Sequence, residues 1–432
     1  MFINRDFRRM LLATAVSDTG SGIHSALITI WIVGTLLQGD DSAPVVTSVV
    51  SSIALGTGVL ANAAAGVLVD RWNKWRTMLC SDLIMAAAVL VILLVSATHS
   101  VIDQPWAVIV IVAVASAVIS GVGPFFTSAR FVITNDIVPE KAYGRAFGYM
   151  HNAETAGQLI GPPLASVIIA SLGAYIGFGI DAATFLFSML LVMLVWRRNR
   201  QYGHSQVKPK QDRNFRAEYI EGFTAIRNNS RALIMLSALS IVGIGGSMFL
   251  RVEIFFLQDD AGLSANWYGI SMGVFAAGLL LGAWIGGRLV DYLDPVKMLV
   301  LTMAFYGLLI IVFPYFSSLL LLLFIKLALG SLAAMLDVSV GPLIMRTMPK
   351  EILGRVIAAF RTVSALGWMF GTMTAGLLAG PVLSGVQFDI YGLDVGRFQI
   401  IFGVAGLLCC GTALVTSVAS SKHDQNAREY AK

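Results

Sequence analysis

Apolar runs of about twenty residues recur along the whole chain, and they constrain its fold more than any other feature. Because an α-helix rises about 1.5 Å per residue, such a run crosses a hydrocarbon layer about 30 Å thick. Only 13% of the residues are charged, against about a quarter in a typical soluble domain. The sequence therefore predicts an all-α membrane protein with twelve transmembrane helices, at about residues 10–37, 45–69, 75–98, 106–134, 146–171, 174–196, 231–258, 266–290, 296–314, 318–345, 353–380 and 396–418.

The positions of lysine and arginine predict how the chain is oriented. Basic residues precede the first run, as Arg5, Arg8 and Arg9, and they recur at every second turn that follows. In the turns of the opposite side, Arg397 is the only lysine or arginine. The positive-inside rule then places both termini in the cytoplasm. A bacterial cytoplasmic (inner) membrane is the location we expect. The formal net charge of +5 follows from this topology and does not indicate nucleic-acid binding.

Two charged turns recur in corresponding places of the two halves of the chain. The stretch "GVLVDRWNKWRTML" (66–79) returns in a worn form as "GRLVDYLDPVKML" (287–299). A second pair, "PEKAYGRAFGYM" (139–150) and "PKEILGRVIAAF" (349–360), shares the pattern Pro-x4-Gly-Arg. One pair follows the second and eighth runs, and the other follows the fourth and tenth. These echoes predict two six-helix bundles related by pseudo-two-fold symmetry.

A long polar segment, residues 197–230, divides the chain nearly in half. We therefore expect a bundle over 1–196, this cytoplasmic linker, a second bundle over 231–418, and a cytoplasmic tail over 419–432. For the first part of the linker, a solvated basic segment is as good an interpretation as one that lies on the membrane. The second part predicts an amphipathic helix on the inner leaflet, because its apolar residues stand at helical spacing. They are Phe215, Tyr219, Phe223 and Ile226.

The first charged turn fits a known signature, G-x-L-a-D-r-x-G-r-k. The matching residues are Gly66, Leu68, Asp70, Arg71 and Lys74. On these residues the chain resembles the major facilitator superfamily, and the resemblance covers nearly its whole length. Asn73 stands where the family has glycine, and since Asn tolerates a left-handed backbone, we expect the turn to form.

The resemblance implies that this turn is a conformational latch. Asp70 would face the N-terminal end of the eleventh predicted helix (353–380), where a carboxylate gains about 0.3–1 kcal/mol from the helix dipole. Arg71 and Arg76 would hold nearby acids. The copy keeps Asp291 but has Tyr292 in place of the arginine, so a weaker latch is expected there. The alternative is a plain tight turn that obeys the positive-inside bias.

A second signature lies in the fifth run, "GYMHNAETAGQLIGPPLAS" (148–166). It resembles the antiporter pattern G-x8-G-x3-G-P-x2-G-G at Gly148, Gly157, Gly161 and Pro162. Small residues at this spacing let two helices approach closely, and the Gly-Pro pair bends the helix. The resemblance implies a seal found in exporters. Generic close packing is the alternative. Within the superfamily the chain resembles the branch of macrolide-efflux proteins and enterobactin-type siderophore exporters, on the stretches "RDFRRMLLATAVSDTG" (5–20), "FFTSARFVITNDIVPE" (125–140) and "GIDAATFLFS" (179–188).

Few charged residues lie inside the apolar runs, where each costs about 2.5–3.5 kcal/mol on insertion scales and normally lines a cavity or pairs. Asp18 is a candidate to carry a proton or bind a cationic substrate group, with hydrogen bonding to nearby hydroxyls as the alternative. An imidazole is the side chain that ordinarily changes its charge near neutral pH, so His24 is a coupling candidate, with a simple helix contact as the alternative. Arg130 and Glu154 are expected to pair, and an unpaired Glu154 would become a second proton carrier.

The second half carries its own buried charges. Asp337 and Arg361 lie at matching distances from the turn between their runs, so a salt bridge is expected. Arg251 and Glu253 are on different faces of the seventh run. At least one should face the outer vestibule, either as a gate or simply solvated. Two more charges are expected only to snorkel to the outer interface, namely Asp181 and Lys326.

No pattern for catalysis, a cofactor or a metal is present. The chain has no phosphate-binding GxxxxGK[ST] loop, no recognisable Ser/His/Asp set and no metal-ligand spacing. We therefore expect a secondary transporter, not an enzyme. The resemblance implies a monomeric, proton-coupled antiporter that exports small amphipathic, drug-like molecules by alternating access, as in multidrug resistance. The alternatives are an exporter of a self-made metabolite such as a siderophore, and a non-transporting scaffold or receptor.

Overall fold

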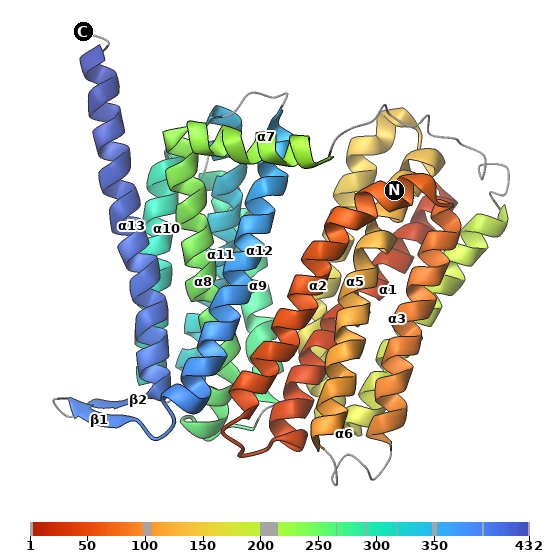
Figure 1. Cartoon of the computed structure of the whole chain (residues 1–432), viewed down its shortest axis with the longest axis horizontal. Coiled ribbons are helices and arrows are strands. Elements are labelled where there is room, and N and C mark those ends of the chain that lie inside the picture. The colour runs from red at the N-terminus through yellow and green to blue at the C-terminus, as the bar shows by residue number, and fades with distance from the viewer. Residues whose placement is uncertain are drawn as a thin grey trace. The chain divides into compact units, whose positions relative to one another are not determined.

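The computed structural model describes residues 3–97, 105–198, 215–264, 266–289, 292–316, 318–347, 352–390 and 393–430. The chain divides into two compact units, of which the first contains mainly α1 to α6 and the second mainly α7 to α13 (Figure 1). The first unit comprises Met1–Ala43, Val49–Asp212 and Ser264–Gly273, and the second comprises Pro44–Ser48, Arg213–Leu263 and Val274–Lys432.

The first unit consists of long helices joined by short turns. Its helices are α1 (Arg5–Trp31), α2 (Ala43–Arg71), α3 (Lys74–Ser96), α5 (Pro105–Ile137) and α6 (Tyr143–Arg198). A π-helical turn (Ile32–Leu36) extends α1, and a 3-10 turn (Glu140–Ala142) precedes α6.

The described residues of the second unit are also mainly helical, and they include a β-hairpin. Its helices are α7 (Phe215–Asn228), α8 (Ser230–Asp259), α9 (Trp267–Leu289), α10 (Pro295–Val312), α11 (Leu319–Thr347), α12 (Leu353–Leu377) and α13 (Arg397–Tyr430). A 3-10 turn (Phe313–Tyr315) follows α10, and a π-helical turn (Leu378–Val382) follows α12.

Eleven helices in the described part of the chain are long and apolar enough to cross a membrane. One of them, α6, contains 56 residues and continues through Pro162, but Gly173 interrupts it with φ 83° and ψ 167°. Only glycine adopts this backbone conformation without strain. The interruption falls between the predicted runs 146–171 and 174–196, so α6 contains two stretches that are each long enough to span a bilayer.

Asparagine side chains start two helices of the first unit. Asn4 accepts a hydrogen bond from the backbone N–H of Phe7 at 2.6 Å, which satisfies a donor at the start of α1. Asn73 caps α3 in the same way, through the N–H of Arg76 at 3.1 Å. Its backbone is extended, with φ −71° and ψ 111°, so the expected left-handed turn is wrong. An N-cap residue needs an extended backbone, and this geometry makes a glycine unnecessary.

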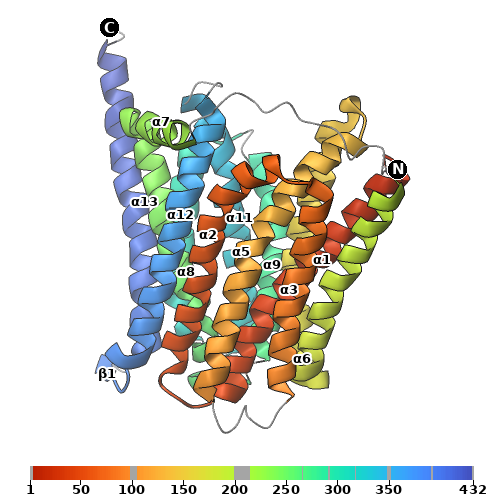
Figure 2. The same cartoon turned by 45° about the vertical axis from the view of Figure 1, so that its right-hand side comes forward.

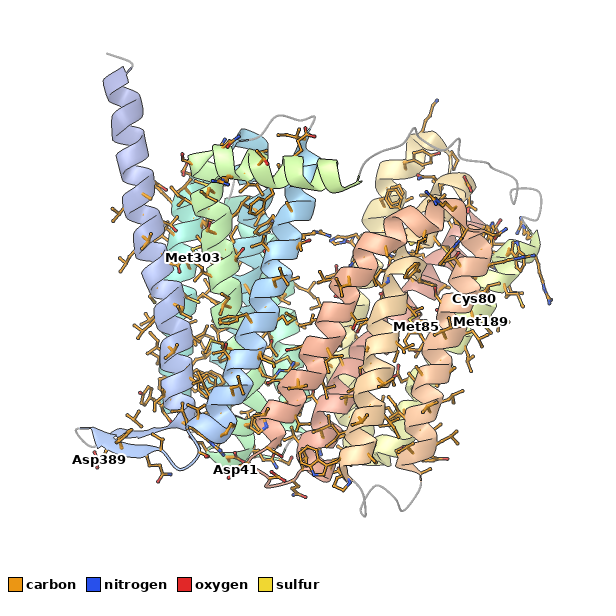
Figure 3. The ribbon with its side chains drawn as sticks, viewed as in Figure 1. Asp41, Cys80, Met85, Met189, Met303 and Asp389 are labelled. Atoms are coloured by element: carbon orange, nitrogen blue, oxygen red, sulfur yellow. The ribbon has the colours of Figure 1, made fainter. Side chains whose placement is uncertain are left out.

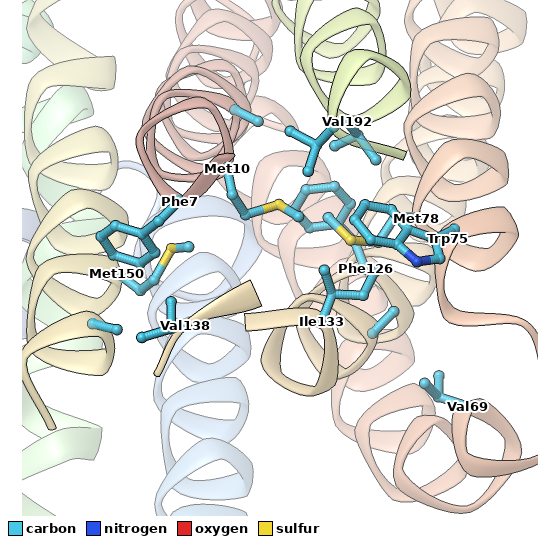
Figure 4. Close-up of a cluster of buried hydrophobic side chains, with 14 of the residues drawn as sticks. Phe7, Met10, Val69, Trp75, Met78, Phe126, Ile133, Val138, Met150 and Val192 are labelled. Carbon is cyan, nitrogen blue, oxygen red and sulfur yellow. The ribbon is translucent and has the colours of Figure 1, made fainter. Parts of the chain in front are cut away.

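The apolar core of the first unit joins α1, α3, α5 and α6. Figure 4 shows Met10 of α1 pointing toward Trp75 and Met78 of α3 and Phe126 of α5, while Phe7 of α1 lies at the other end of the same cluster. All five side chains are almost fully buried. A buried side chain of this size contributes about 1.5–3 kcal/mol when it leaves water, although lipid-facing helices gain less from burial than from tight packing.

Helix α7 lies across the ends of α8 and α12 in the second unit (Figure 1). Its Ile226 is buried against Leu236 of α8 and Val356 of α12, while Phe223 is exposed. The helix predicted within the linker is therefore present. Figure 2 shows α13 continuing beyond the end of α8, so residues of the predicted tail extend the last helix.

A short β-hairpin corrects the purely α-helical expectation. Strand β1 (Gln387–Ile390) pairs antiparallel with β2 (Leu393–Gly396), with Gln387 opposite Gly396. Arg397 then begins α13, donating to Asp259 of α8 at 2.7 Å and to the carbonyl of Ala379 at 3.2 Å. The hairpin thus leads into a helix whose start is tied to its neighbours.

Candidate functional site

Three charged side chains from three helices of the first unit form one cluster, called here the Arg130 triad. Arg130 of α5 donates from Nη1 to Asp18 Oδ2 of α1 at 3.4 Å and from Nη2 to Glu154 Oε2 of α6 at 3.0 Å. The Arg130 side chain is 7% exposed, whereas those of Asp18 and Glu154 are 21% and 33% exposed. The expected pairing of Arg130 with Glu154 is confirmed, and Asp18 joins it unexpectedly.

The triad contains two carboxylates and one guanidinium. The planar guanidinium can direct one N–H group to each acid, but it neutralises only one negative charge. A second, uncompensated charge in a low-dielectric interior costs several kcal/mol. Binding one proton or one cationic group at the triad would remove that cost, and either of them would exclude the other.

Glycines explain how α1 and α6 approach so closely beside the triad. A Cβ atom added at Gly161 would lie 2.6 Å from the Cα of Gly22, and one added at Gly157 would lie 2.9 Å from the Cβ of Asp18. Real Cβ contacts are longer, so larger residues would push the two helices apart. The predicted close approach is confirmed at these two positions. At Gly148 a Cβ would meet nothing within 4 Å.

A second polar pair links α1 and α6 farther along α1. His24 Nδ1 lies 2.8 Å from Asp181 Oδ2, and both side chains are buried. The expectation that Asp181 only snorkels is wrong, because its face of α6 packs on α1 and finds a polar partner inside the bundle. His24 is likewise no isolated residue.

Asp82 of α3 was missed by the sequence analysis. It is fully buried, and its Oδ2 accepts a hydrogen bond from Ser188 Oγ of α6 at 2.8 Å. It also lies close enough to Asp18 for the two carboxyl groups to interact electrostatically. A lone carboxylate in the otherwise uncharged part of the third run was the signal available in the sequence.

In the second unit, Glu253 of α8 and Lys326 of α11 form a salt bridge, and both side chains are fully buried. The Lys326 ammonium also lies 4.7 Å from the ring centre of Phe249 and 4.9 Å from that of Phe275. Lys326 therefore does not snorkel, and Glu253 does not face a vestibule, because each neutralises the other inside the bundle. Arg251 is half-buried.

The expected salt bridge between Asp337 of α11 and Arg361 of α12 is not formed in the described part of the chain. Both side chains are exposed, although they lie near enough to interact electrostatically. An equal distance from the turn between two helices therefore does not by itself bring two side chains into contact.

Only some residues of the predicted latch lie in the part of the chain that the structure describes. Arg71 and Arg76 are exposed, whereas Lys74 is half-buried and interacts electrostatically with Asp136 of α5. The side chains of Gly66 and Asp70, and the whole of Asp291, lie outside what the structure describes. The start of α12, expected to receive Asp70, belongs to the other unit. The latch therefore stays a prediction.

The fold and the buried charges define a class of protein, a multi-pass membrane protein with ionisable groups in its helical interior. The sequence matches the Major Facilitator Superfamily over residues 10–372. The chain therefore belongs to this superfamily and is a transporter rather than an enzyme, as the sequence predicted.

Relatives of the chain include efflux proteins, and a solved transporter shares its fold. The chain is 24% identical over 382 residues to the multidrug resistance protein MdtG of Escherichia coli O9:H4 (strain HS), covering 87% of this chain and 83% of that protein. It is 26% identical over 265 residues to macrolide efflux protein A of Streptococcus pyogenes, covering 60% and 63%. The crystal structure of a mutant of the nucleoside transporter NupG matches with a TM-score of 0.73 at 13% identity, covering 96% of this chain and 100% of that one.

Proposed function

We propose that this protein exports small amphipathic cations in exchange for protons, with the Arg130 triad as the site where the two compete. The observation that carries the proposal is that one guanidinium serves two carboxylates. The triad keeps one negative charge that either a proton or a substrate cation can neutralise. Such mutual exclusion is what antiport requires.

The cycle would run by alternating access. From the outer side, a proton binds Asp18 and releases the substrate; on the inner side, the proton leaves and a substrate cation takes its place. Arg130 keeps Glu154 neutralised throughout, so Asp18 is the group that exchanges its partner. Names of the efflux relatives support export of drug-like molecules as the direction and substrate class.

The topology that goes with this proposal has twelve crossings, with α6 contributing two. Both termini and α7 lie in the cytoplasm, and the chain works as a monomer in a bacterial inner membrane. The domains follow the sequence boundaries at 196/197, 230/231 and 418/419, and α7 lies on the inner leaflet. The latch at Asp70 would stabilise the outward-open state.

The test uses inverted membrane vesicles energised to an acidic interior and containing a pH-sensitive dye. Amphipathic cations, macrolides and catecholates are added in turn. One class should prompt proton release from vesicles carrying the wild-type protein, and the Asp18→Asn variant should abolish the release because its triad no longer needs a proton. Asp41→Asn is the matched control, since Asp41 lies in the exposed turn between α1 and α2 (Figure 3).

Expression of each variant is checked by quantitative blotting of the same vesicles. Normal proton release by Asp18→Asn would rule out Asp18 as the exchanging group. Release prompted only by catecholates would favour the exporter of a self-made metabolite. Transport of any of the compounds without proton release would refute antiport.

A further inference from the structure

The pair formed by His24 and Asp181 has a polar atom left over at each end. His24 Nδ1 is bonded to Asp181 Oδ2, but His24 Nε2 and Asp181 Oδ1 have no hydrogen-bond partner among the described residues, although both atoms are buried. A buried polar atom without a partner has lost its hydrogen bonds to water and gained none in return. If the pair served only to hold α1 against α6, two well-packed apolar residues in its place would hold the helices at least as well. The cost points to a role in which the open nitrogen is used.

The hydrogen bond decides which nitrogen is available. A carboxylate can only accept, so with Asp181 ionised the bond requires a proton on Nδ1 of His24. The lone pair is then on Nε2, and it is the basic position of the pair. Asp181 thus selects the tautomer, and its negative charge stabilises an imidazolium.

The proton step changes the charge of the pair. One proton from the aqueous side adds to the Nε2 lone pair, no bond breaks, and the neutral imidazole becomes an imidazolium. The pair as a whole goes from a charge of −1 to zero. Because the neutral form suits a dry interior and the charged form does not, protonation favours the closed packing of α1 on α6.

We propose that Nε2 of His24 is a second proton-binding site of the transport cycle, with Asp181 as its positioning residue. This inference rests on the proposed antiport and adds a second proton to it. His24 lies six residues beyond Asp18, about 9 Å along α1. The two sites therefore lie at different depths on one helix of the first unit, about 120° apart around its axis.

Few other charges act on this pair. Helices α6 and α5 pack against α1. Asp181 is the only ionisable side chain of the described part in contact with His24. The other charges facing α1 in the described part are Arg130 of α5 and Glu154 of α6 in the triad, Asp82 of α3, which interacts electrostatically with Asp18, and Arg198 of α6, which pairs with Asp6. Among the described residues, Asp181 is therefore the ionic partner that touches the His24 ring.

The first experiment needs no substrate. The chain contains five histidines, so solid-state NMR of protein with ¹⁵N-labelled histidine in lipid, compared with the His24→Gln variant, assigns the His24 signals by their disappearance. We expect His24 to change from imidazole to imidazolium as the pH is lowered through the range in which transport runs. A His24 ring that keeps one charge state throughout that range would overturn the inference.

The second experiment separates proton coupling from folding. Proteoliposomes are loaded with tetraphenylphosphonium, a permanent cation, and its efflux is measured under a proton gradient and in equilibrium exchange. His24→Gln should lower gradient-driven efflux by about tenfold or more, in keeping with the loss of a proton-transfer group, while exchange stays within about twofold of wild type. Thr29→Val, which removes another buried polar group of α1, should change neither rate.

The Asp181→Asn variant tests positioning. Without the counter-charge, the imidazolium is harder to form, so half-maximal gradient-driven efflux should require a more acidic outer solution. Equal loss of exchange and driven efflux in both variants would assign the pair a structural role. Wild-type driven efflux in His24→Gln would overturn the inference alone, whereas exchange without any gradient dependence in wild type would overturn the proposed antiport itself.

Discussion

Substituting Gly161 by alanine tests the contact that brings α1 against α6. The added Cβ would lie 2.6 Å from the Cα of Gly22 and 2.7 Å from the N of Ile23. Ordinary contacts begin near 3.4 Å, and the atoms met are backbone, so α1 must move by about 0.8 Å. Overpacking of this kind costs about 1–3 kcal/mol, of which the higher helix propensity of alanine recovers about 0.5–1 kcal/mol.

We therefore expect Gly161→Ala to destabilise the protein by about 0.5–2 kcal/mol. Its proton-driven export should also fall, because a shift of α1 displaces Asp18 from Arg130 and His24 from Asp181. Unfolding by denaturant in detergent micelles measures the first effect, and the vesicle assay measures the second. Gly148→Ala is the matched control within the same signature, since its Cβ would meet nothing within 4 Å.

The comparison between the two alanine variants decides the matter. The control should match wild type or be slightly more stable. If Gly161→Ala proved as stable and as active as Gly148→Ala, the close packing of α1 on α6 would be wrong, and so would the explanation of the signature in the fifth apolar run (148–166).

Three further predictions concern stability. Lys326→Met should lower the free energy of unfolding by about 3–5 kcal/mol, because it leaves Glu253 buried without its partner. Adding Glu253→Gln should recover most of this loss, and additive losses in chemical unfolding would refute the pairing. Asn73→Ala should lower the free energy of unfolding by about 1 kcal/mol through loss of the α3 cap, and Asn73→Gly by only a few tenths of a kcal/mol. Equal unfolding midpoints for wild type and both variants would contradict the role of Asn73 as a cap. Burial raises the pKa of Asp260, against the opposing effects of Gln399 and Arg397. Its ionisation therefore opposes folding as the pH rises above the unfolded value, and Asp260→Asn should raise the thermal midpoint at neutral pH but not in acid.

The helical framework could be predicted from the sequence because it depends on local properties. Long apolar runs must form helices in a bilayer, since each backbone N–H and C=O needs a partner there. The residues at Gly157 and Gly161 likewise signalled a close helix contact from their spacing alone. Arg130 and Glu154 could be paired only loosely, since they lie nine and fifteen residues from Pro139 in the turn between their runs.

The partners of the buried charges depended on the tertiary structure. Depth along a helix is read from residue number, but which face meets which neighbour follows from packing between segments far apart in the chain. Asp181 is 157 residues from His24, and Lys326 is 73 residues from Glu253, so neither pair leaves a local pattern. For Asp337 and Arg361, equal distance from a turn was misleading, because the two side chains interact electrostatically but form no salt bridge. The sequence determined that charges are buried in this protein, and only the packing of its helices decided which of them neutralise one another.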